Sequence, residues 1–457
     1  MATSLFQDPI YRRFALQRPI AVNAQLVLQR LLDPRVLDDL FHRHAQAQTE
    51  RILLFSTLTH LMASVVLGKA ASVNAAFEKM RDQLLVSKTA VYEKLQRVEP
   101  QTVRELVRHS YRQVVELWHE CGGLPHHEVT GYEQRILDGN HLSATEHRLT
   151  ETRSQTAAPL PGKTLVVFDP RRGAVADIVP IEDGHAQERS ALEALIETLQ
   201  AKQLWIADRN FCTMRFLFEI AKQLGFFVIR QHGTVKGKLK GRRRFIGDGP
   251  TGRVYEQEIQ LSFDDQTRTL RRITIELKQA TRDGDIALHL LTNLPPKDVS
   301  ALVVAELYRR RWTIETLFLE VTQTLTCEIN TLCYPKAALF VFCLALVAAN
   351  AVAVIKAALR AAHTAEKADE LSGYYLAFEI KQVHDGMMIA LPPARWRVFR
   401  GMSVPTFAKV LKKIAAHVDL TMYRKSPRGP KKPPPQKTRY RNGSHVSTHK
   451  LLADDDQ

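Results

Sequence analysis

Cysteine is scarce in this chain, and the few cysteines present exclude the frameworks that depend on them. The 457 residues contain five, with no CxxC pair and no zinc-ligand spacing: Cys121, Cys212, Cys327, Cys333 and Cys343. An odd, scattered set of this kind is typical of reduced thiols in a cytosolic protein. The first fourteen residues also lack the apolar segment of a secretory signal peptide. We therefore expect a cytoplasmic protein.

Acidic residues are outnumbered by basic ones. The chain has 48 Asp and Glu against 64 Lys and Arg, a formal net charge of +16. A surplus of that size usually marks a polyanionic partner, either nucleic acid or an anionic membrane surface. Nine of the basic residues lie in 424–450, which holds several prolines and no acid. We expect that tail to be extended or disordered until it meets a partner.

One apolar segment is about as long as a membrane span. Residues 337–355 are apolar apart from Asn350. A helix that is buried on all sides in a soluble α/β protein has the same composition. The overall content of 45% hydrophobic and 25% charged residues fits a soluble protein with a sizeable core. We favour the buried helix and expect no membrane partner.

The first 127 residues are predicted to form an all-helical N-terminal domain. Helices are expected over 51–67 and 71–80. Ser87 is placed to cap a further helix over 88–97. That helix has the small, polar and basic residues of a recognition helix in a helix-turn-helix. A helix that only packs in the domain is the equal alternative.

From about residue 128 the pattern changes to strands and helices. A hairpin followed by strands that alternate with helices predicts an α/β fold, with a mixed sheet flanked by helices. The expected strands are 134–138, 164–168, 174–180, 203–207 and 226–230, and the expected helices are 186–200 and 213–224.

Residues 231–295 interrupt this alternation and predict a β-rich insertion. Strands are expected over 254–263, 271–277 and 287–292, and helix resumes from about 298 to 326. The insertion opens with a predicted basic loop; its charged residues are Lys236, Lys238, Lys240, Arg242, Arg243 and Arg244. A solvated turn is the alternative explanation of that loop.

Three acids stand where a metal site can form. Asp138 and Asp208 each end a predicted strand, and Glu315 lies on a helix after the sheet. Strand ends present side chains at one edge of a sheet. Carboxylates hold the paired divalent ions that cleave polynucleotides, and Mg²⁺ needs few protein ligands. Taken singly, the two aspartates also fit an ordinary turn and a helix cap.

The helix segment around Glu315 is strongly basic. Tyr308, Arg311 and Glu315 stand at i, i+3 and i+7, so they share one stripe of a helix. A carboxylate among so many positive charges is well placed to hold a metal ion beside a phosphate backbone. A surface helix with ordinary ion pairs is the alternative.

Together these motifs resemble a DDE transposase of the bacterial insertion-sequence-four type, over roughly residues 130–350. The motifs that carry the resemblance are Leu137-Asp138-Gly139-Asn140 with Thr145-Glu146-His147-Arg148, Ile206-Ala207-Asp208-Arg209-Asn210-Phe211, and Tyr308-x2-Arg311-x3-Glu315. The last is the beginning of that family's Tyr-Arg-Glu-Lys signature, and a β-rich insertion between the second and third acids also fits.

The resemblance implies an RNase H-like catalytic core in two parts, 128–230 and 296–420, on either side of the insertion 231–295. It implies a DNA-binding N-terminal domain 1–127, followed at the other end by the basic tail 421–457. Two Mg²⁺ or Mn²⁺ ions would be held by Asp138, Asp208 and Glu315. Water would free a 3′-hydroxyl at the transposon end, and that hydroxyl would attack target DNA.

The resemblance also implies the partners. Tyr308 and Arg311 would contact DNA phosphates, and the basic loop 236–244 would lie along the DNA. The partners would be double-stranded transposon ends and target DNA, bound by a homodimer associated with a bacterial nucleoid. Where relatives hold a flipped base on an aromatic residue of the insertion, this chain offers Phe245, Tyr255 or Phe263.

The chain departs from the family at one position. The residue seven after Glu315 should be Lys or Arg, and here it is Thr322. That leaves open a catalytically weakened or inactive, transposase-derived DNA-binding protein. Other candidate metal ligands, at 126–128 and at His141 with His147, lack a paired cluster. Trp205 and Trp312 are expected to pack in the core beside the acids.

Overall fold

The computed structural model describes residues 6–48, 52–122, 129–146, 149–281, 283–425 and 445–454. The helices are α2 (Pro9–Gln17), α3 (Pro19–Leu31), α4 (Pro34–His44), α5 (Phe55–Val66), α6 (Val73–Lys79), α7 (Lys88–Arg97), α8 (Pro100–Cys121), α9 (Thr150–Arg153), α10 (Glu193–Ile196), α11 (Met214–Lys222), α12 (Ala301–Arg309), α13 (Thr313–Thr324), α14 (Pro335–Ala362), α15 (Ala365–Asp369), α16 (Gly373–Ala390), α17 (Pro393–Trp396), α18 (Val404–Ala415) and α19 (Thr448–Asp454). The strands are β1 (Glu133–His141), β2 (Ala158–Leu160), β3 (Lys163–Asp169), β4 (Ala174–Ile181), β5 (Gln203–Ala207), β6 (Phe226–Arg230), β7 (Lys238–Asp248), β8 (Gly252–Phe263), β9 (Gln266–Leu277), β10 (Ala287–Thr292) and β11 (His445–Ser447). Three 3-10 turns matter for the site: η2 (Glu188–Leu192), η3 (Arg209–Phe211) and η4 (Arg310–Trp312).

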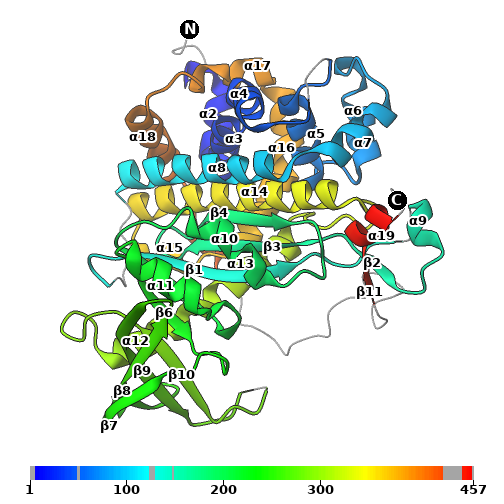
Figure 1. Cartoon of the computed structure of the whole chain (residues 1–457). Helices are drawn as coiled ribbons and strands as arrows, with labels where there is room; N and C mark the ends of the chain where they lie inside the picture. The colour runs from blue at the N-terminus through cyan, green and yellow to red at the C-terminus, as the bar shows by residue number, and fades with distance from the viewer. Residues whose placement is uncertain are drawn as a thin grey trace.

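The chain folds into a helical layer above a large mixed sheet (Figure 1). Nine strands pair in the order β4-β3-β1-β5-β6-β10-β9-β8-β7. Strands β1, β5 and β6 are parallel, whereas β3 and β4 run antiparallel to their neighbours. Alternate strand residues serve two cores: Ile136 belongs to the core shared with the helical layer, and Leu137 to the core around α11. The predicted mixed sheet flanked by helices is confirmed.

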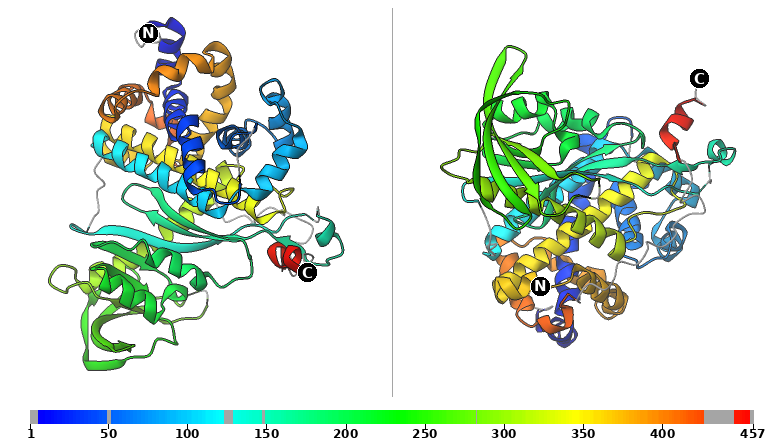
Figure 2. Two further views of the ribbon diagram at one scale, coloured as in Figure 1. Left: turned by 45° about the horizontal axis from the view of Figure 1, so that its top comes forward. Right: turned by 90° about the horizontal axis from the view of Figure 1, so that it is seen from below.

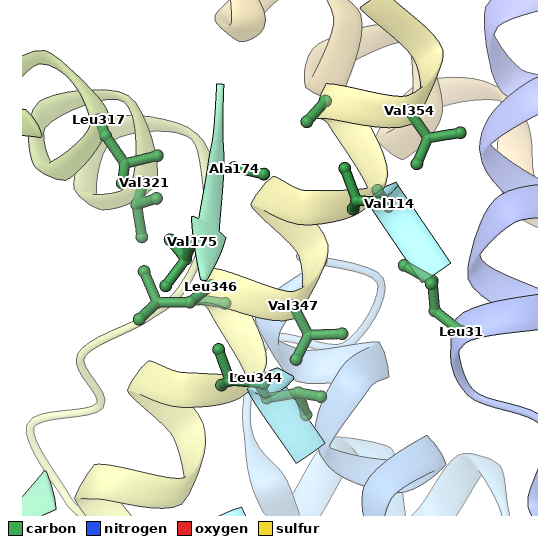
Figure 3. Close-up of a cluster of buried hydrophobic side chains, with 14 of the residues drawn as sticks. Leu31, Val114, Ala174, Val175, Leu317, Val321, Leu344, Leu346, Val347 and Val354 are labelled. Carbon is green, nitrogen blue, oxygen red and sulfur yellow. The ribbon is translucent and has the colours of Figure 1, made fainter. Parts of the chain in front are cut away.

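The apolar segment is the central helix of the helical layer. Helix α14 packs against α8, α3 and α18 and against strand β4, and its side chains interlock with theirs (Figure 3). By length and composition alone it could cross a membrane, but 83% of its most apolar 18-residue window is buried in the protein. The favoured buried helix is therefore what the fold contains.

The single polar residue of that apolar run, Asn350, is fully buried and joins three elements. Its side-chain oxygen accepts a 2.7 Å hydrogen bond from the Val175 amide on β4. Its amide nitrogen donates to the Val175 carbonyl and to the hydroxyl of Ser110 on α8. Asn350 therefore fixes how α14 sits between the sheet and α8.

The N-terminal helices join the C-terminal helices in one layer. Ser87 caps α7 as expected, accepting a hydrogen bond from the Ala90 amide. Val91 and Leu95 on that helix are buried, while Lys88, Thr89, Glu93 and Arg97 are exposed. Helix α7 thus packs against the domain through one face and exposes the other, so the packing alternative is confirmed and the recognition helix stays a prediction.

The β-rich insertion extends the main sheet. Strand β10 joins β6 to β9, and β8 and β7 continue to the sheet edge, where the strands curl over (Figure 2). The basic segment predicted as a loop is mostly edge strand β7, which pairs with β8 through two bulges. Lysines, arginines and bulges protect an exposed edge from pairing with another sheet, so such a strand stays soluble.

Strands 203–207, 226–230 and 287–292 are confirmed to the residue as β5, β6 and β10. The helix predicted over 186–200 is wrong: the chain forms η2 and the single turn α10, because contacts of the η2 side chains with the sheet outweigh local propensity. The helix predicted from 298 to 326 begins at Ala301 and is interrupted by η4.

The tail expectation is wrong for residues 445–454; residues 426–444 lie outside the described part. Strand β11 pairs in parallel with β2, and α19 packs against α9. Two side-chain contacts hold this end. Nε2 of His185 lies 2.9 Å from Nδ1 of His445, and Lys450 forms an ion pair with Asp183 at 3.4 Å. Long-range pairing thus orders a segment whose composition predicted disorder.

Candidate active site

The two aspartates stand side by side at one edge of the parallel strands. Strands β1 and β5 pair from Glu133 with Gln203 to Leu137 with Ala207, so Asp138 and Asp208 are the next residues of adjacent strands. Strand β5 ends there as predicted. Strand β1 was predicted to end at Asp138 but continues to His141, because its last residues still pair with β3 on the other side.

Each aspartate is oriented by a backbone amide that follows it. Asp138 accepts a 3.0 Å hydrogen bond from the amide of Gly139. Asp208 caps turn η3 and accepts a 2.7 Å bond from the amide of Asn210. The remaining carboxylate oxygens are therefore available to other groups.

Arg311 connects the third acid to this pair. Helix α13 lies against β1, and turn η4 at its start carries the guanidinium of Arg311 into the sheet edge. One terminal nitrogen of Arg311 donates to Asp138 at 2.6 Å, and the other donates to Glu315 at 3.3 Å. Asp138, Asp208 and Glu315 are thus brought into one region.

The electrostatics of Asp138 report this crowding. Its pKa is raised to about 6, mainly by burial and also by the negative charges of Asp208 and Glu315, while Arg311 and the Gly139 amide act in the opposite direction. Burial opposes the charge of Arg311, but the carboxylates of Asp138, Asp208 and Glu315 raise its pKa. The charges of Asp208 and Glu315 are therefore close enough to act on both Asp138 and Arg311.

The carboxylates do not form a ready-made metal cluster. In the described part of the chain, no group of three or more His, Cys, Asp and Glu side chains could hold a metal ion as it stands. The physical reason is that Arg311 lies between Asp138 and Glu315 and already neutralises them. Its Nε atom is buried without a hydrogen-bond partner. Carboxylate oxygens suit Mg²⁺ or Mn²⁺, so the donor set fits such an ion once the guanidinium moves.

The other signature residues take different positions. Tyr308 is buried behind Arg311, with its pKa raised by that burial. Trp205 is buried in the core as expected. The expectation for Trp312 is wrong: its side chain is 59% exposed, and Arg311 stands over its ring at 5.2 Å. The helix is interrupted here, so consecutive residues at 311 and 312 face inward and outward.

The side chain of Thr322 forms hydrogen bonds with the backbone of its own helix. Its hydroxyl donates to the carbonyl of Phe318 at 2.9 Å and lies 3.2 Å from that of Leu319. A neutral side chain held in this way offers no charge to a phosphate.

The six predicted DNA-binding residues of the insertion lie on or next to β7, away from the three acids in the sheet order. Five are exposed and Lys240 is half-buried. Arg243 pairs with Glu276, and Arg244 with Glu256. A hollow of about 490 Å³ lies beside them, lined in part by Lys240 and Arg242. Strand β7 also contacts α12, the helix that leads to Arg311.

Of the candidate histidines, His141 is the one that lies within the described residues. His141 has one acidic neighbour, Glu188, at 3.8 Å. His147 and residues 126–128 lie outside the described residues. Glu188 itself was missed by sequence reasoning, since it lies in a segment predicted as plain helix; Gly139, directly after Asp138, was the signal that another group comes close there.

Residues 130–351 match the protein family described as "Transposase DDE domain". This segment of the chain is therefore similar to the transposase DDE domains, and it contains all three acids. A relative from Sinorhizobium fredii (strain NBRC 101917 / NGR234), named "Putative transposase y4zB", is 29% identical over 169 residues. That match spans 36% of this chain and 44% of the relative, less than half its length.

Among solved structures, a piggyBac transposase synaptic complex with hairpin DNA aligns with 86% of this chain and 85% of its own. The TM-score is 0.42 and the sequence identity is 10%.

Proposed function

We propose that this protein is a transposase that cleaves the ends of a DNA element and joins them to target DNA in a metal-dependent reaction. The observation that carries the proposal is the meeting of Asp138, Asp208 and Glu315 around Arg311 within a segment that matches the transposase DDE domains. The strand order β4-β3-β1-β5-β6, with β1, β5 and β6 parallel, supports an RNase H-like core.

Asp138, Asp208 and Glu315 would hold two Mg²⁺ or Mn²⁺ ions, which supply charge neutralisation at the scissile phosphate and activation of the attacking oxygen. Arg311 would exchange its hydrogen-bond partners during the reaction. A guanidinium recognises phosphate with the same paired hydrogen bonds that it uses for carboxylates. Arg311 would leave Asp138 and Glu315 for a DNA phosphate, so the carboxylates become free only when DNA is present.

The DNA would follow the basic side of the molecule. The exposed residues of β7 and the contact of this strand with α12 support a path from the insertion toward Arg311. Exposed Lys88 and Arg97 support a second contact at α7. We further propose that a homodimer brings two DNA ends together and that the protein works in the bacterial cytoplasm, at the nucleoid.

Thr322 favours a second candidate function. A protein of this fold without a basic residue at that position would bind element ends yet cleave them poorly. It would then act as a scaffold or repressor of transposition.

A duplex cleavage assay distinguishes the two. End-labelled duplexes that carry the terminal repeats flanking the gene are incubated with Mg²⁺ or Mn²⁺ and wild-type protein, Glu315→Ala or Glu306→Ala. Glu306 is the matched control, because it also pairs with arginines of the same region, but with Arg309 and Arg310 instead of Arg311. Metal-dependent nicking that only Glu315→Ala loses supports the transposase. Binding without cleavage by any of the proteins favours the scaffold, and neither binding nor cleavage contradicts both.

A further inference from the structure

A fourth carboxylate lies between the turns that follow the two aspartates. Glu188 begins η2, directly after the loop that leaves β4, and only 15% of its side chain is exposed. Its one ion pair among the described residues is with His141, at the long distance of 3.8 Å. A mostly buried acid with so weak a charge partner must be held there by other contacts.

One oxygen of Glu188 holds the turn after Asp208. The side-chain amide of Asn210 donates a 2.6 Å hydrogen bond to Oε2 of Glu188. The backbone amide of the same Asn210 donates to Asp208. Asn210 is therefore fixed at both ends, and the direction of its backbone N–H determines how the carboxylate of Asp208 is oriented.

The other oxygen of Glu188 lies against the residue after Asp138. A methyl group added at Gly139 would overlap Oε1 and Cδ of Glu188, far inside van der Waals contact. Glycine at 139 is thus what admits the carboxylate. The amide of Gly139 is also the donor that orients Asp138.

We infer that Glu188 is a positioning residue of the active site, which sets the orientation of Asp208 through Asn210 and of Asp138 through Gly139. The inference rests on the proposed function, since it concerns the carboxylates that would hold the ions. This role requires only an oxygen that accepts the hydrogen bond from Asn210. The oxygen of Glu188 is therefore needed, whereas its negative charge is not.

The test measures the Mn²⁺ concentration for half-maximal cleavage of the labelled duplex, together with Mn²⁺ binding to the DNA-bound full chain by calorimetry. Residues that orient ligands typically contribute about 10- to 100-fold in metal affinity or activity. We expect Glu188→Ala to weaken Mn²⁺ binding and raise the half-maximal concentration by about that factor. Glu188→Gln, which keeps an acceptor for Asn210, is expected to change both by less than about tenfold.

Two further variants separate positioning from a general effect on folding. Glu193→Ala removes an exposed acid from the next turn, paired at 2.6 Å with Arg215, and is expected to behave as wild type. Gly139→Ala alone is expected to weaken Mn²⁺ binding about as much as Glu188→Ala. The double variant is expected to be little worse than Glu188→Ala, because the carboxylate that the new methyl group would overlap is then absent. Strictly additive effects of the two substitutions would contradict the inferred contact.

The outcomes separate this inference from the proposed function. A wild-type protein that cleaves DNA, with Glu188→Ala unchanged in Mn²⁺ dependence, overturns the inference alone. A Glu188→Gln variant as impaired as Glu188→Ala overturns positioning, because the charge itself would then be needed. A wild-type protein that neither binds Mn²⁺ nor cleaves overturns both.

Discussion

Arg311 donates a 2.6 Å hydrogen bond to Asp138, and this pair joins the helix that carries Glu315 to the edge of the sheet. Both side chains are largely buried, at 9% and 18% exposure. A buried ion pair contributes little net stability when intact, but removal of one partner leaves an uncompensated charge. Asp138 and Arg311 therefore contribute to the stability of the fold and, in the proposed reaction, also to its chemistry.

We expect Arg311→Ala to lower the free energy of unfolding by about 3–5 kcal/mol, because Asp138 is left buried and unpaired. Urea unfolding of the full chain measures this. Arg309→Ala is the control: its side chain is 52% exposed and pairs only with Glu306, so its loss should cost less than about 1 kcal/mol. Equal effects of the two substitutions would contradict the buried pairing.

The raised pKa of Asp138 predicts a pH dependence of stability. With a pKa of about 6 in the folded chain and 3.8 as its ordinary value, Asp138 binds its proton more tightly when folded. Its contribution to stability is therefore favourable below pH 4, falls as the pH rises from about 4 to 6, and stays unfavourable above. Asp138→Asn does not titrate at this position, so its stability relative to that of wild type should rise as the pH rises through that window, whatever the constant cost of losing the pair with Arg311.

Urea unfolding of wild type and Asp138→Asn at pH 4, 5, 6 and 7 tests the sign. A difference between the two proteins that is constant with pH would show that Asp138 has an ordinary pKa.

Asn350 gives a prediction about the helical layer. Asn350→Leu removes its hydrogen bonds to the Val175 amide and carbonyl, buried between α14 and β4, while the Ser110 hydroxyl on α8 still donates to the Val107 carbonyl. Each unsatisfied buried group costs about 1–3 kcal/mol, although leucine adds apolar contact. We expect a clear loss of stability in urea unfolding without detergent. An unchanged or increased stability would mean that Asn350 is only a tolerated polar residue.

How much of this could be predicted from sequence depended on how local the cause was. Strands β5, β6 and β10 are short apolar runs bounded by turn residues, so pattern alone located them. Asp138 and Asp208 were found as predicted strand ends, which present side chains at one edge of a sheet. That β1 continues past Asp138 and runs parallel beside β5 could not be seen from the pattern. The site's third acid was found from the spacing of Tyr308, Arg311 and Glu315, which survives a 3-10 interruption that the spacing does not reveal.

The features that were missed depend on contacts between distant segments. Glu188 reaches Gly139 and Asn210, which are 49 and 22 positions away along the chain, so no local pattern identifies it. Strand β11 is ordered by pairing with β2, which is distant from it in the sequence. Trp312 was placed in the core on its residue type, whereas the turn at η4 exposes it.

Thr322 allows the departure from the family signature to be tested by restoring a charge. In Thr322→Lys the neutral side chain that closes on Phe318 is replaced by one long enough to reach a phosphate, and lysine also favours a helix more than threonine does. One added phosphate contact increases the slope of log affinity against log salt by about 0.9 for duplex DNA. We expect that increase, together with faster cleavage. Gln323→Lys is the matched control, because it adds the same charge to the exposed neighbouring position. If both variants change the salt slope and neither changes the cleavage rate, the added charge acts through general attraction to DNA, and position 322 has no specific role in the reaction.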